Sequence, residues 1–424
     1  MTKLRVWGRS QISGEIRISG NKNAALPIIA ASILTDEPVV LRNMPDILDV
    51  RSMLKIVADL GAEVSFKDGV AEIHAANITS HEISREACSD TRTSILFAAP
   101  LTARCGAAVL YPPGGDVIGR RRLDGHFYGL TKLGAVAVYG ERYQFETPHG
   151  LVGTELFLDE ASVTATEQIM LAAATAEGIT ILRNAASEPH VTDLGNLLNA
   201  MGGKISGLGS NTLEIEGVRK LHGVDYTVCG DHIEAGSFLA LAAARGGELT
   251  VRGTSPRNYW MLRRVFERFN IKMEVHPDRV FLPGGQRLEV TNDMGGHIPE
   301  ISDGPWPQYP SDMMSCSIVM ATQAQGSVLF FEKMFESRIY FVDRLIAMGA
   351  NAIVCDPHRV VISGVATLHG TQLPSPDIRA GMALLIAAIC AHGESVINNC
   401  EVIYRGYECL PEKLASIGCR LEEF

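Results

Sequence analysis

Several marks of common protein classes are missing from this sequence. The nine cysteines include no C-x-x-C pair and the twelve histidines no H-x-x-x-H spacing, so we expect no metal site. The odd cysteine number fits a reducing cytoplasm. No apolar segment marks a secretory signal at the start, and the most apolar run, residues 382–391, is far shorter than a membrane span. Basic residues are outnumbered, and the net charge of −10 argues against general nucleic-acid binding.

The bulk composition is that of a folded, soluble protein. Hydrophobic residues make up 46% of the 424 residues and charged residues 20%, which excludes a disordered chain. This length exceeds one ordinary core, so two or three domains are expected. With an acidic balance overall, any anionic ligand needs a local cluster of cations.

One pattern recurs along the chain. A helix ends in a Leu/Met/Ile-Gly-small tripeptide, and a strand, a turn and a second strand follow. Clear copies contain Gly61, Gly134, Gly202, Gly349 and Gly418, and a degraded copy lies at Phe269-Asn270, with Ile271 expected to begin its strand. Gly61 and Gly418 lie 357 residues and five periods apart, which gives six repeats of about 71 residues. Each glycine suits the position after a helix, where φ is often positive.

Each repeat also contains an apolar helix of small residues, followed by an apolar strand. A helix that is apolar on every side belongs inside a domain, so we expect buried helices with sheets outside them. The helices are expected at residues 24–34, 94–103, 168–177, 235–244, 313–323 and 380–392. Their strands are expected at residues 39–42, 107–111, 180–183, 248–252, 327–331 and 395–398. The predicted fold class is α/β.

The starts of these helices gather polar and charged residues. Asp, Ser and Thr at such positions have an ordinary role as helix caps. Lys22, Arg92 and Arg379 cannot be explained in this way, because a cation at a helix N-terminus opposes the helix dipole. An anionic ligand shared with the helix end would account for all three.

Six repeats divide most simply into three and three. Residues 1–20 precede the first full repeat and are expected to form a strand that pairs with the late part of the chain. One domain would then hold residues 1–20 and 230–424, and the other residues 21–229. Two crossings would join the domains, an arrangement suited to hinge closure on a ligand.

A loop rich in glycine and proline, residues 112–126, carries both an acid and a basic cluster. Asp116 lies four to six residues before Arg120, Arg121 and Arg122. This arrangement suits a lid that closes on an anionic substrate, because loops commonly carry function. A surface turn with solvated charges is the alternative.

Five stretches together resemble one enzyme family. They are SGNKNAALP at residues 19–27, PGGDVIG at 113–119, SEP at 187–189, DHIEAG at 231–236 and YPSDM at 309–313. In register along the whole chain, they resemble the UDP-N-acetylglucosamine 1-carboxyvinyltransferases, which perform the first committed step of peptidoglycan precursor synthesis. The fold this implies is a two-domain inside-out α/β barrel built from six repeated units, three per domain.

The resemblance implies transfer of the enolpyruvyl group from phosphoenolpyruvate to the 3-hydroxyl of UDP-N-acetylglucosamine, with release of phosphate by addition and elimination. Such chemistry needs a base for the hydroxyl proton, an acid for the methylene carbon, and cations for phosphate and carboxylate. Phosphoenolpyruvate is a substrate here, and no cofactor is implied. The partners expected are these two small molecules, with no nucleic acid and no membrane.

Residue roles follow from the resemblance alone. Asp312 is implied to be the base, and Asp116 the acid. Phosphoenolpyruvate would be held by Lys22, Arg121 and Arg405, with Lys22 and Arg405 counted as catalytic and Arg92 and Arg379 extending the cationic wall. The nucleotide sugar would contact Asn23, Leu123, Asp124, Ser162, Val163 and Asp312. An interdomain charge network would include Glu188, Asp231, Glu234, Glu336, Arg338 and Asp377, of which Arg338 and Asp377 are also assigned to substrate binding.

Asp116 departs from the family pattern, in which most members have cysteine at this loop position and some have aspartate. A carboxylic acid donates a proton only if it holds one, and burial or a bound phosphate anion would favour that state while arginines oppose it. The departure implies insensitivity to fosfomycin, because that epoxide alkylates the cysteine thiol and a carboxylate is a weaker nucleophile.

Other departures concern the acceptor. Glu160 replaces a lysine near the nucleotide, and Arg122, Gly125, His190 and His232 also differ from the usual residues. We expect the positive charge of Arg122 to compensate for the negative charge that Glu160 introduces. The sequence therefore predicts the donor substrate, phosphoenolpyruvate, more firmly than the acceptor substrate.

Three alternatives stay open. The chain could move enolpyruvyl to another uridine nucleotide or a modified nucleotide sugar. It could also be a catalytically silent protein that binds a nucleotide sugar. The related shikimate-pathway transferase fits less well, because its glycine- and threonine-rich run is replaced here by Ser89-Asp90-Thr91-Arg92-Thr93-Ser94.

Overall fold

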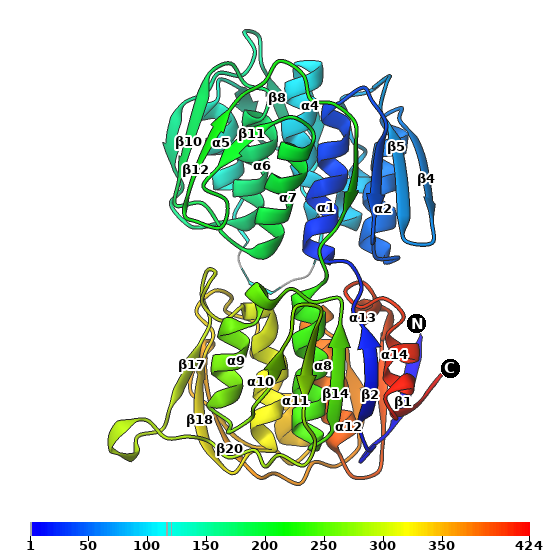
Figure 1. The fold of residues 1–424 in the computed structure, drawn as a ribbon, viewed down its shortest axis with the longest axis vertical. Helices are drawn as coiled ribbons and strands as arrows, with labels where there is room; N and C mark the ends of the chain where they lie inside the picture. The colour runs from blue at the N-terminus through cyan, green and yellow to red at the C-terminus, as the bar shows by residue number, and fades with distance from the viewer. Residues whose placement is uncertain (1, 116–117, 120) are drawn as a thin grey trace. The chain divides into compact units, whose positions relative to one another are not determined.

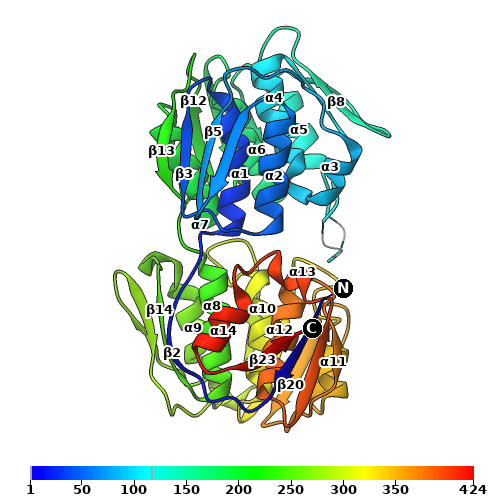
Figure 2. The ribbon, with the colours of Figure 1, turned by 90° about the vertical axis from the view of Figure 1, so that its right-hand side faces the viewer.

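The computed structural model describes residues 2–115, 118–119 and 121–424 (Figures 1 and 2). These residues form two compact units. Unit 1 contains residues 2–19, 118–119 and 230–424, and unit 2 contains residues 20–115 and 121–229. Asp116, the acid implied by the resemblance, lies outside the described residues.

Unit 2 consists of buried helices covered by three sheets. The inner helices are α1 (Lys22–Ala31), extended by the 3₁₀ turn η1 (Ser32–Leu34), α4 (Ala98–Cys105), preceded by the 3₁₀ turn η2 (Arg92–Phe97), and α6 (Val163–Ala173). The other helices are α2 (Leu48–Asp59), α3 (Arg85–Asp90), α5 (Asp124–Lys132) and α7 (Pro189–Ala200). One sheet has the strand order β13 (Val224–Thr227), β3 (Val39–Arg42), β5 (Val70–His74), β4 (Glu63–Lys67). The second has the order β9 (Glu155–Phe157), β10 (Ile179–Arg183), β12 (Thr212–Glu216), β11 (Lys204–Ser206). The third has the order β6 (Ala107–Leu110), β8 (Tyr143–Glu146), β7 (Val136–Val138).

Unit 1 repeats this plan. Its inner helices are α8 (His232–Arg245), α10 (Ser311–Thr322) and α12 (Ile378–Cys390). Its other helical segments are η3 (Pro256–Asn258), α9 (Trp260–Glu267), η4 (Met294–Gly296), α11 (Val342–Ala347), α13 (Glu401–Tyr404) and α14 (Leu410–Ser416). One sheet has the strand order β2 (Ser13–Arg17), β14 (Glu248–Arg252), β16 (Arg279–Leu282), β15 (Glu274–Val275). The second has the order β17 (Glu300–Ser302), β18 (Gly326–Phe331), β20 (Arg359–Gly364), β19 (Asn351–Val354). The third has the order β21 (Gln372–Pro374), β22 (Glu394–Asn398), β1 (Lys3–Trp7), β23 (Arg420–Glu423).

The sheets share one topology, which shows that the sequence repeat is also a structural repeat. The strand after the inner helix has an antiparallel pair of strands on one side and a parallel strand on the other, as in β10 with β12 and β9. The antiparallel pair is a hairpin except in the sheet of β22, where β1 and β23 come from the two ends of the described chain. In the sheet of β6 the parallel neighbour is reduced to a single bridge, Glu82 to Val109. Three such sheets in each unit, around buried helices, confirm the inside-out α/β barrel of six repeats.

The repeat glycines have the conformation that the pattern predicts. Their φ angles lie between 94° and 109°, and Asn270 in the degraded copy has φ 56°. The strand expected to begin at Ile271 is wrong, because β15 begins only at Glu274. The Gln286 side chain explains the shift: it accepts from the Lys272 N–H and donates to the Lys272 carbonyl, so these groups are not available to a sheet partner.

Two other expectations need correction. The N-terminal residues form two strands rather than one: β1 pairs with β22 and β23, and β2 pairs with β14, so both join the late part of the chain as expected. Helix α6 begins at Val163 and not at Gln168. Its polar first turn is helical because Ser162 caps it, accepting from the Ala165 N–H at 3.4 Å.

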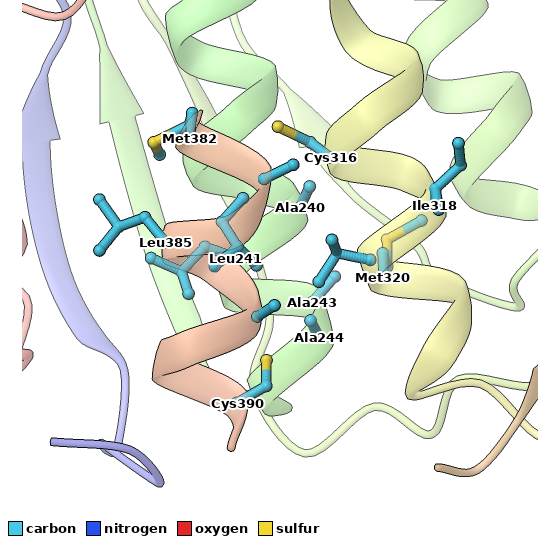
Figure 3. Packing of buried hydrophobic residues seen from close by; sticks show 14 of the residues in the cluster. Ala240, Leu241, Ala243, Ala244, Cys316, Ile318, Met320, Met382, Leu385 and Cys390 are labelled. Atoms are coloured by element: carbon cyan, nitrogen blue, oxygen red, sulfur yellow. The ribbon is translucent and has the colours of Figure 1, made fainter. Parts of the chain in front are cut away.

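The core of unit 1 lies where its three inner helices meet. Figure 3 shows small residues of α8, including Ala240 and Ala243, facing Met320 of α10 and Leu385 of α12. These side chains are fully buried. Alanines on α8 allow the helices to approach closely, which explains why these segments are rich in small residues. Among the described residues, no helix has the length and apolar character needed to span a membrane.

Candidate active site

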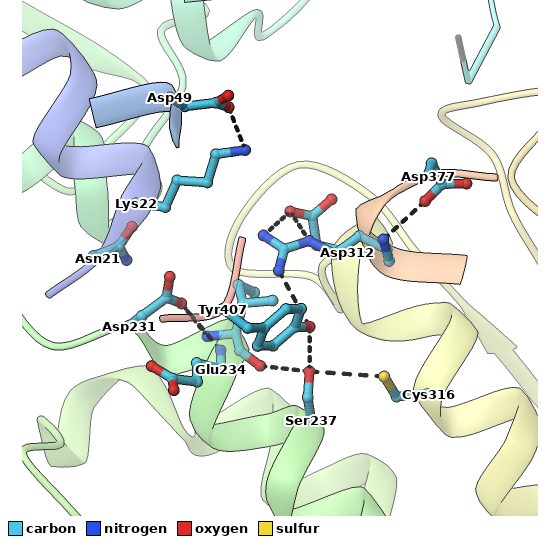
Figure 4. Close-up of polar contacts among 12 residues, drawn as sticks. Asn21, Lys22, Asp49, Asp231, Glu234, Ser237, Asp312, Cys316, Asp377 and Tyr407 are labelled. Carbon is cyan, nitrogen blue, oxygen red and sulfur yellow. Dashed lines mark hydrogen bonds and ion pairs between the residues drawn. The ribbon is translucent and has the colours of Figure 1, made fainter. Parts of the chain in front are cut away.

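The most tightly organised polar cluster of unit 1 surrounds Asp312, in the first turn of α10 (Figure 4). Its Oδ1 accepts from Nη2 of Arg338 at 2.9 Å. Its Oδ2 accepts from Nε of Arg379 at 3.0 Å and from Nη2 at 2.8 Å. The two arginine side chains are 3% and 6% exposed, whereas that of Asp312 is 27% exposed. The carboxylate is therefore the part of this cluster that a substrate can reach.

Arg379 is held from its other side as well. Nη1 donates to the Tyr407 hydroxyl at 3.3 Å, and that hydroxyl lies 2.8 Å from Oγ of Ser237 on α8. Burial opposes the charge of Arg379, but the nearby Asp312, Tyr407 and Asp231 outweigh it and raise its pKa. Arg379 is thus a permanent cation that links α12 to α10 and, through Tyr407, to α8.

The starts of α8 and α12 are capped by predicted residues. Asp231 accepts from the N–H groups of Ile233 and Glu234 at 2.8 and 3.1 Å. Asp377 accepts from the N–H groups of Arg379 and Ala380 at 2.8 and 2.9 Å. The ordinary role of aspartate as a helix cap therefore holds for both residues.

Glu234 is buried in the first turn of α8. It accepts from the Ser19 N–H at 2.8 Å and from Lys413 Nζ at 2.5 Å, and Lys413 also donates to the Ser19 hydroxyl. Burial raises the pKa of Glu234 to about 7, although Lys413 opposes the rise. This pair fastens α8 to α14.

A second buried carboxyl group lies behind Asp312. Glu332 accepts from the Ser311 hydroxyl at 2.8 and 2.9 Å and from the Phe335 N–H at 3.1 Å. Burial, together with the adjacent carboxyl of Asp303, raises the pKa of Glu332 to about 9. At neutral pH this group therefore holds a proton, and it contacts Ser311, the residue that precedes Asp312 on α10.

In unit 2, Lys22 is the first residue of α1, and its Nζ lies 2.8 Å from Oδ2 of Asp49 on α2. The preceding Asn21 caps the helix, accepting from the Ala24 N–H at 3.2 Å. Lys22 and Asp49 expose only 12% and 6% of their side chains. Asp49 thus offsets the unfavourable placement of a cation at a helix N-terminus.

Arg92, the first residue of η2, has no such carboxylate. Its Nη2 donates to the carbonyls of Arg121 at 2.8 Å and Arg122 at 3.4 Å, and no ion pair joins it to any acid of the described residues. Burial, with a smaller effect from the charge of Arg121, lowers the pKa of Arg92 to about 10. A half-buried cation with a cationic neighbour and without a counterion is a ready site for an anion.

The starts of α5 and α6 bring together several residues assigned to the nucleotide sugar. Leu123 and Asp124 begin α5, while Ser162 and Val163 begin α6. His126 joins the two helices, because its Nε2 lies 3.0 Å from Thr164 Oγ1 and its Nδ1 contacts Gln168 Oε1. Burial lowers the pKa of His126 to about 4, so this histidine is a neutral structural link.

Arg122 and Glu160, two of the unusual residues, form an ion pair. Nη2 of Arg122 lies 3.5 Å from Oε2 of Glu160, with 46% and 59% of the side chains exposed. The positive charge of Arg122 thus pairs directly with the negative charge that Glu160 introduces.

The remaining predicted residues occupy scattered positions. Asn23 is the second residue of α1, and Arg405 directly follows α13; both are half-buried. Glu188 precedes α7, and Glu336 is exposed between β18 and α11. His190 and His232 are buried, and burial lowers the pKa of His232.

Sequence reasoning missed the partners of the charged residues. Asp49, Tyr407, Ser237 and Lys413 were not singled out, although each contacts a predicted residue or extends its network. Tyr407 lies two residues after Arg405, which is the one local signal. The other partners come from distant segments, and no spacing in the sequence announces them. No group of His, Cys, Asp or Glu arranged for a metal ion occurs among the described residues.

Comparison with known proteins decides the family. A model described as EPSP synthase (3-phosphoshikimate 1-carboxyvinyltransferase) matches residues 6–414. The UDP-N-acetylglucosamine 1-carboxyvinyltransferase of Treponema denticola is 51% identical over 423 residues, covering 100% of this chain and 99% of the relative. The protein of that name from Bradyrhizobium diazoefficiens is 49% identical over 418 residues, covering 98% and 97%. The chain belongs to the UDP-N-acetylglucosamine 1-carboxyvinyltransferase family.

Solved structures agree with this family in fold. The enolpyruvyl transferase NikO from Streptomyces tendae matches with a TM-score of 0.88 at 22% identity, covering 100% of this chain and 99% of that one. EPSP synthase from Acinetobacter baumannii matches with a TM-score of 0.77 at 17% identity, covering 100% of both chains. At these identities the likeness establishes the inside-out barrel and not the substrates.

Proposed function

We propose that this chain transfers the enolpyruvyl group of phosphoenolpyruvate to the 3-hydroxyl of UDP-N-acetylglucosamine and releases phosphate, in peptidoglycan precursor synthesis. The observation that carries the proposal is the identity of about half of all residues, over the full length, with relatives of that name. Its substrates are thus small molecules. The nine cysteines, all free thiols, support a cytoplasmic location.

The reaction divides into two steps with the same groups. In the addition, the hydroxyl oxygen bonds to C2 of phosphoenolpyruvate, a base takes the hydroxyl proton, and an acid supplies a proton to C3. In the elimination, C3 returns a proton, the C2–C3 double bond forms again, and the bond from C2 to the phosphate oxygen breaks. We assign the base to Asp312, whose carboxylate is the exposed part of an otherwise buried cluster.

The anionic donor needs cations at its phosphate and carboxylate. We assign Lys22, Arg121 and Arg405 to phosphoenolpyruvate, and Arg92 and Arg379 to the surrounding positive field. Arg92 gives this assignment its best support, because it carries a half-buried charge that no carboxylate of the described residues pairs with. The nucleotide sugar is assigned to Asn23, Leu123, Asp124, Ser162 and Val163, with Arg338 and Asp377 placing Asp312 and Arg379.

Asp116 is proposed as the acid in place of the usual cysteine. A carboxylate is a poor nucleophile toward an epoxide, so turnover should persist with fosfomycin at concentrations that inactivate a cysteine-bearing relative. Mass spectrometry after incubation provides the check: a covalent adduct on Asp116 would contradict the insensitivity.

A different uridine nucleotide is the second candidate acceptor. The Arg122–Glu160 ion pair favours it, because one cation near the proposed nucleotide site is already engaged by an acid. The same transfer chemistry would then act on another hydroxyl.

Phosphate release tests these proposals together. Wild type and Asp116→Asn are assayed with phosphoenolpyruvate and UDP-N-acetylglucosamine, UMP or no acceptor. Release with the UDP-sugar alone, lost in the variant, supports both the reaction and the acid. Release with UMP selects the second acceptor, and saturable UDP-sugar binding without release would indicate a silent binding protein.

A further inference from the structure

Arg379 uses all three guanidinium nitrogens on protein groups. Nε and Nη2 contact Asp312 Oδ2 at 3.0 and 2.8 Å, and Nη1 donates to the Tyr407 hydroxyl at 3.3 Å. The Arg379 guanidinium also lies over the Tyr407 ring, 5.5 Å from its centre. Asp312 and Tyr407 are therefore the two anchors of this buried cation, one charged and one neutral.

We infer the direction of the hydrogen bonds beyond Tyr407 from their neighbours. The Ser237 hydroxyl donates to the Ile233 carbonyl at 2.9 Å, so its oxygen is left to accept from the Tyr407 hydroxyl at 2.8 Å. The Cys316 thiol also points to the Ser237 oxygen, at 3.7 Å (Figure 4). With its own hydrogen directed to Ser237, the Tyr407 oxygen presents a lone pair to Arg379.

We propose that Tyr407, oriented by Ser237, is a positioning residue that keeps Arg379 in place while Asp312 accepts a proton and returns it. The inference rests on the proposed function, in which Asp312 is the base. A proton on Asp312 removes the charge that holds Arg379, and a buried guanidinium without an anchor is costly. The phenol does not change charge in the reaction, so its hydrogen bond persists through that step.

The surroundings support this role. Burial raises the pKa of Tyr407, so the hydroxyl stays protonated. Among the described residues, the charged or titratable groups near this hydrogen-bond chain include Asp231 and His232 from the start of α8, Cys316 and Asp312 from α10, and Arg338, which donates to Asp312. Burial lowers the pKa of His232 and raises that of Cys316 to about 11, so both are neutral at pH 7 and neither can replace the phenol as a charged anchor.

A matched tyrosine–serine pair lies in the same unit and serves as a control. The hydroxyl of Tyr309 is 2.5 Å from Oγ of Ser317, and both residues are buried. This pair also involves helix α10. No hydrogen bond leads from it to Arg379 in the described residues, so it shares the burial and chemistry of the Tyr407–Ser237 pair without the link to the base.

The experiment compares Tyr407→Phe with Tyr309→Phe. Phenylalanine keeps the ring over the guanidinium and removes only the hydroxyl. We expect Tyr407→Phe to lower kcat about tenfold with KM for the acceptor changed less than about twofold, and to move the acid limb of the pH–kcat profile to higher pH. Tyr309→Phe should leave kcat and the profile unchanged. Ser237→Ala removes the hydroxyl that orients Tyr407, so it should lower kcat in the same way but by a smaller factor. Ser237→Thr keeps a hydroxyl, so its kcat and pH profile should match those of wild type.

The outcomes separate the inference from the function. If wild type releases phosphate and both phenylalanine variants match it, or both lose kcat equally with equal drops in thermal midpoint, the positioning role is overturned and the function stands. If wild type releases no phosphate with any acceptor, the proposed function fails and the inference falls with it. A kcat loss and profile shift confined to Tyr407→Phe and Ser237→Ala supports both.

Discussion

Arg379 in unit 1 and Arg92 in unit 2 both stand at the start of an inner helix, but their charges are met in opposite ways. Arg379 has a carboxylate on one side and a phenol on the other. Among the described residues, Arg92 contacts backbone carbonyls and has a cationic neighbour, and no carboxylate pairs with it. Proteins rarely bury an unpaired charge. We infer from this difference that unit 1 uses its arginine to position the proposed base, whereas the arginine of unit 2 is available to the proposed anionic ligand.

The largest effect expected from this comparison follows removal of the charge on Asp312. Asp312→Asn would remove the carboxylate charge that both buried guanidinium groups contact, so we expect the free energy of unfolding to fall by about 3 kcal/mol. Loss of a general base should lower turnover at least about 100-fold. Phosphate release and urea unfolding measure the two effects.

Asp343→Asn is the matched control, because Asp343 is exposed in the first turn of α11 in the same unit. It should leave turnover and stability unchanged. Wild-type turnover in Asp312→Asn would contradict the assignment of the base, even if the stability loss were found.

The two units also differ in a buried glutamate, and this difference can be measured through the pH dependence of the free energy of unfolding. The folded pKa of Glu234 is raised to about 7 from 4.5, so the folded state binds this proton more tightly than the unfolded state. Its contribution to stability is complete below pH 4.5 and is lost as pH rises toward 7. At about 1.4 kcal/mol per pH unit, wild type should lose about 3 kcal/mol relative to Glu234→Gln over that range and then level off.

Glu167 on α6 is the counterpart in unit 2. It is fully buried, its Oε1 has no hydrogen-bond partner in the described residues, and burial together with Glu188 raises its pKa well above the ordinary value. Among the described residues no cation opposes this rise, as Lys413 does for Glu234, so the stability of wild type relative to Glu167→Gln should also fall as pH rises above 4.5. Unfolding series from pH 4 to 9 measure this, and a difference that does not change with pH would contradict the raised pKa.

The next effect concerns Arg92 itself. Since Arg92 forms no ion pair with the part of the chain that the structure describes, Arg92→Met should change the free energy of unfolding by less than about 1 kcal/mol. If its charge is kept for an anion, KM for phosphoenolpyruvate should rise about tenfold.

Arg104 offers a close control at the other end of the same helical segment. It lies in the last turn of α4, and its guanidinium donates to the carbonyls of Ile33, Thr35 and Ala76. Arg104→Met should therefore reduce stability without changing KM. A rise in KM for both variants would show only a loss of net positive charge.

The fold was open to prediction because it repeats. Six copies of one pattern average out local ambiguity, and β3, β14 and the repeat glycines appear where the pattern places them. Errors occurred where side chains take over a backbone role. Gln286 occupies the amide of Lys272 and shortens a strand, and Ser162 caps a turn whose polar residues do not look helical.

The site was open to prediction only in part. The sequence singled out Lys22, Arg92 and Arg379 as cations at helix starts, and the family resemblance singled out Asp312; the structure describes all four at or near the start of a helical segment. Their partners are not visible, since Asp49 and Tyr407 reach them from other elements through the tertiary fold. Whether a cation is paired or available to a ligand is therefore a property of the structure, and it separates Arg379 from Arg92.

The smallest expected effect concerns an exposed cation, Arg122, and compares its paired state with its unpaired state. Glu160→Gln would convert Arg122 from a paired into an unpaired cation. The pair is exposed, so the free energy of unfolding should change by less than about 0.5 kcal/mol. The freed charge should tighten binding of UDP-N-acetylglucosamine about twofold to threefold at low salt, and less at high salt, because the charges are screened. Titration calorimetry at two ionic strengths measures this. Glu155→Gln is the control, since Glu155 pairs with Arg183 in the same unit with similar exposure. An equal gain in both variants would indicate a general loss of negative charge, whereas a gain confined to Glu160→Gln would place Arg122 beside the nucleotide.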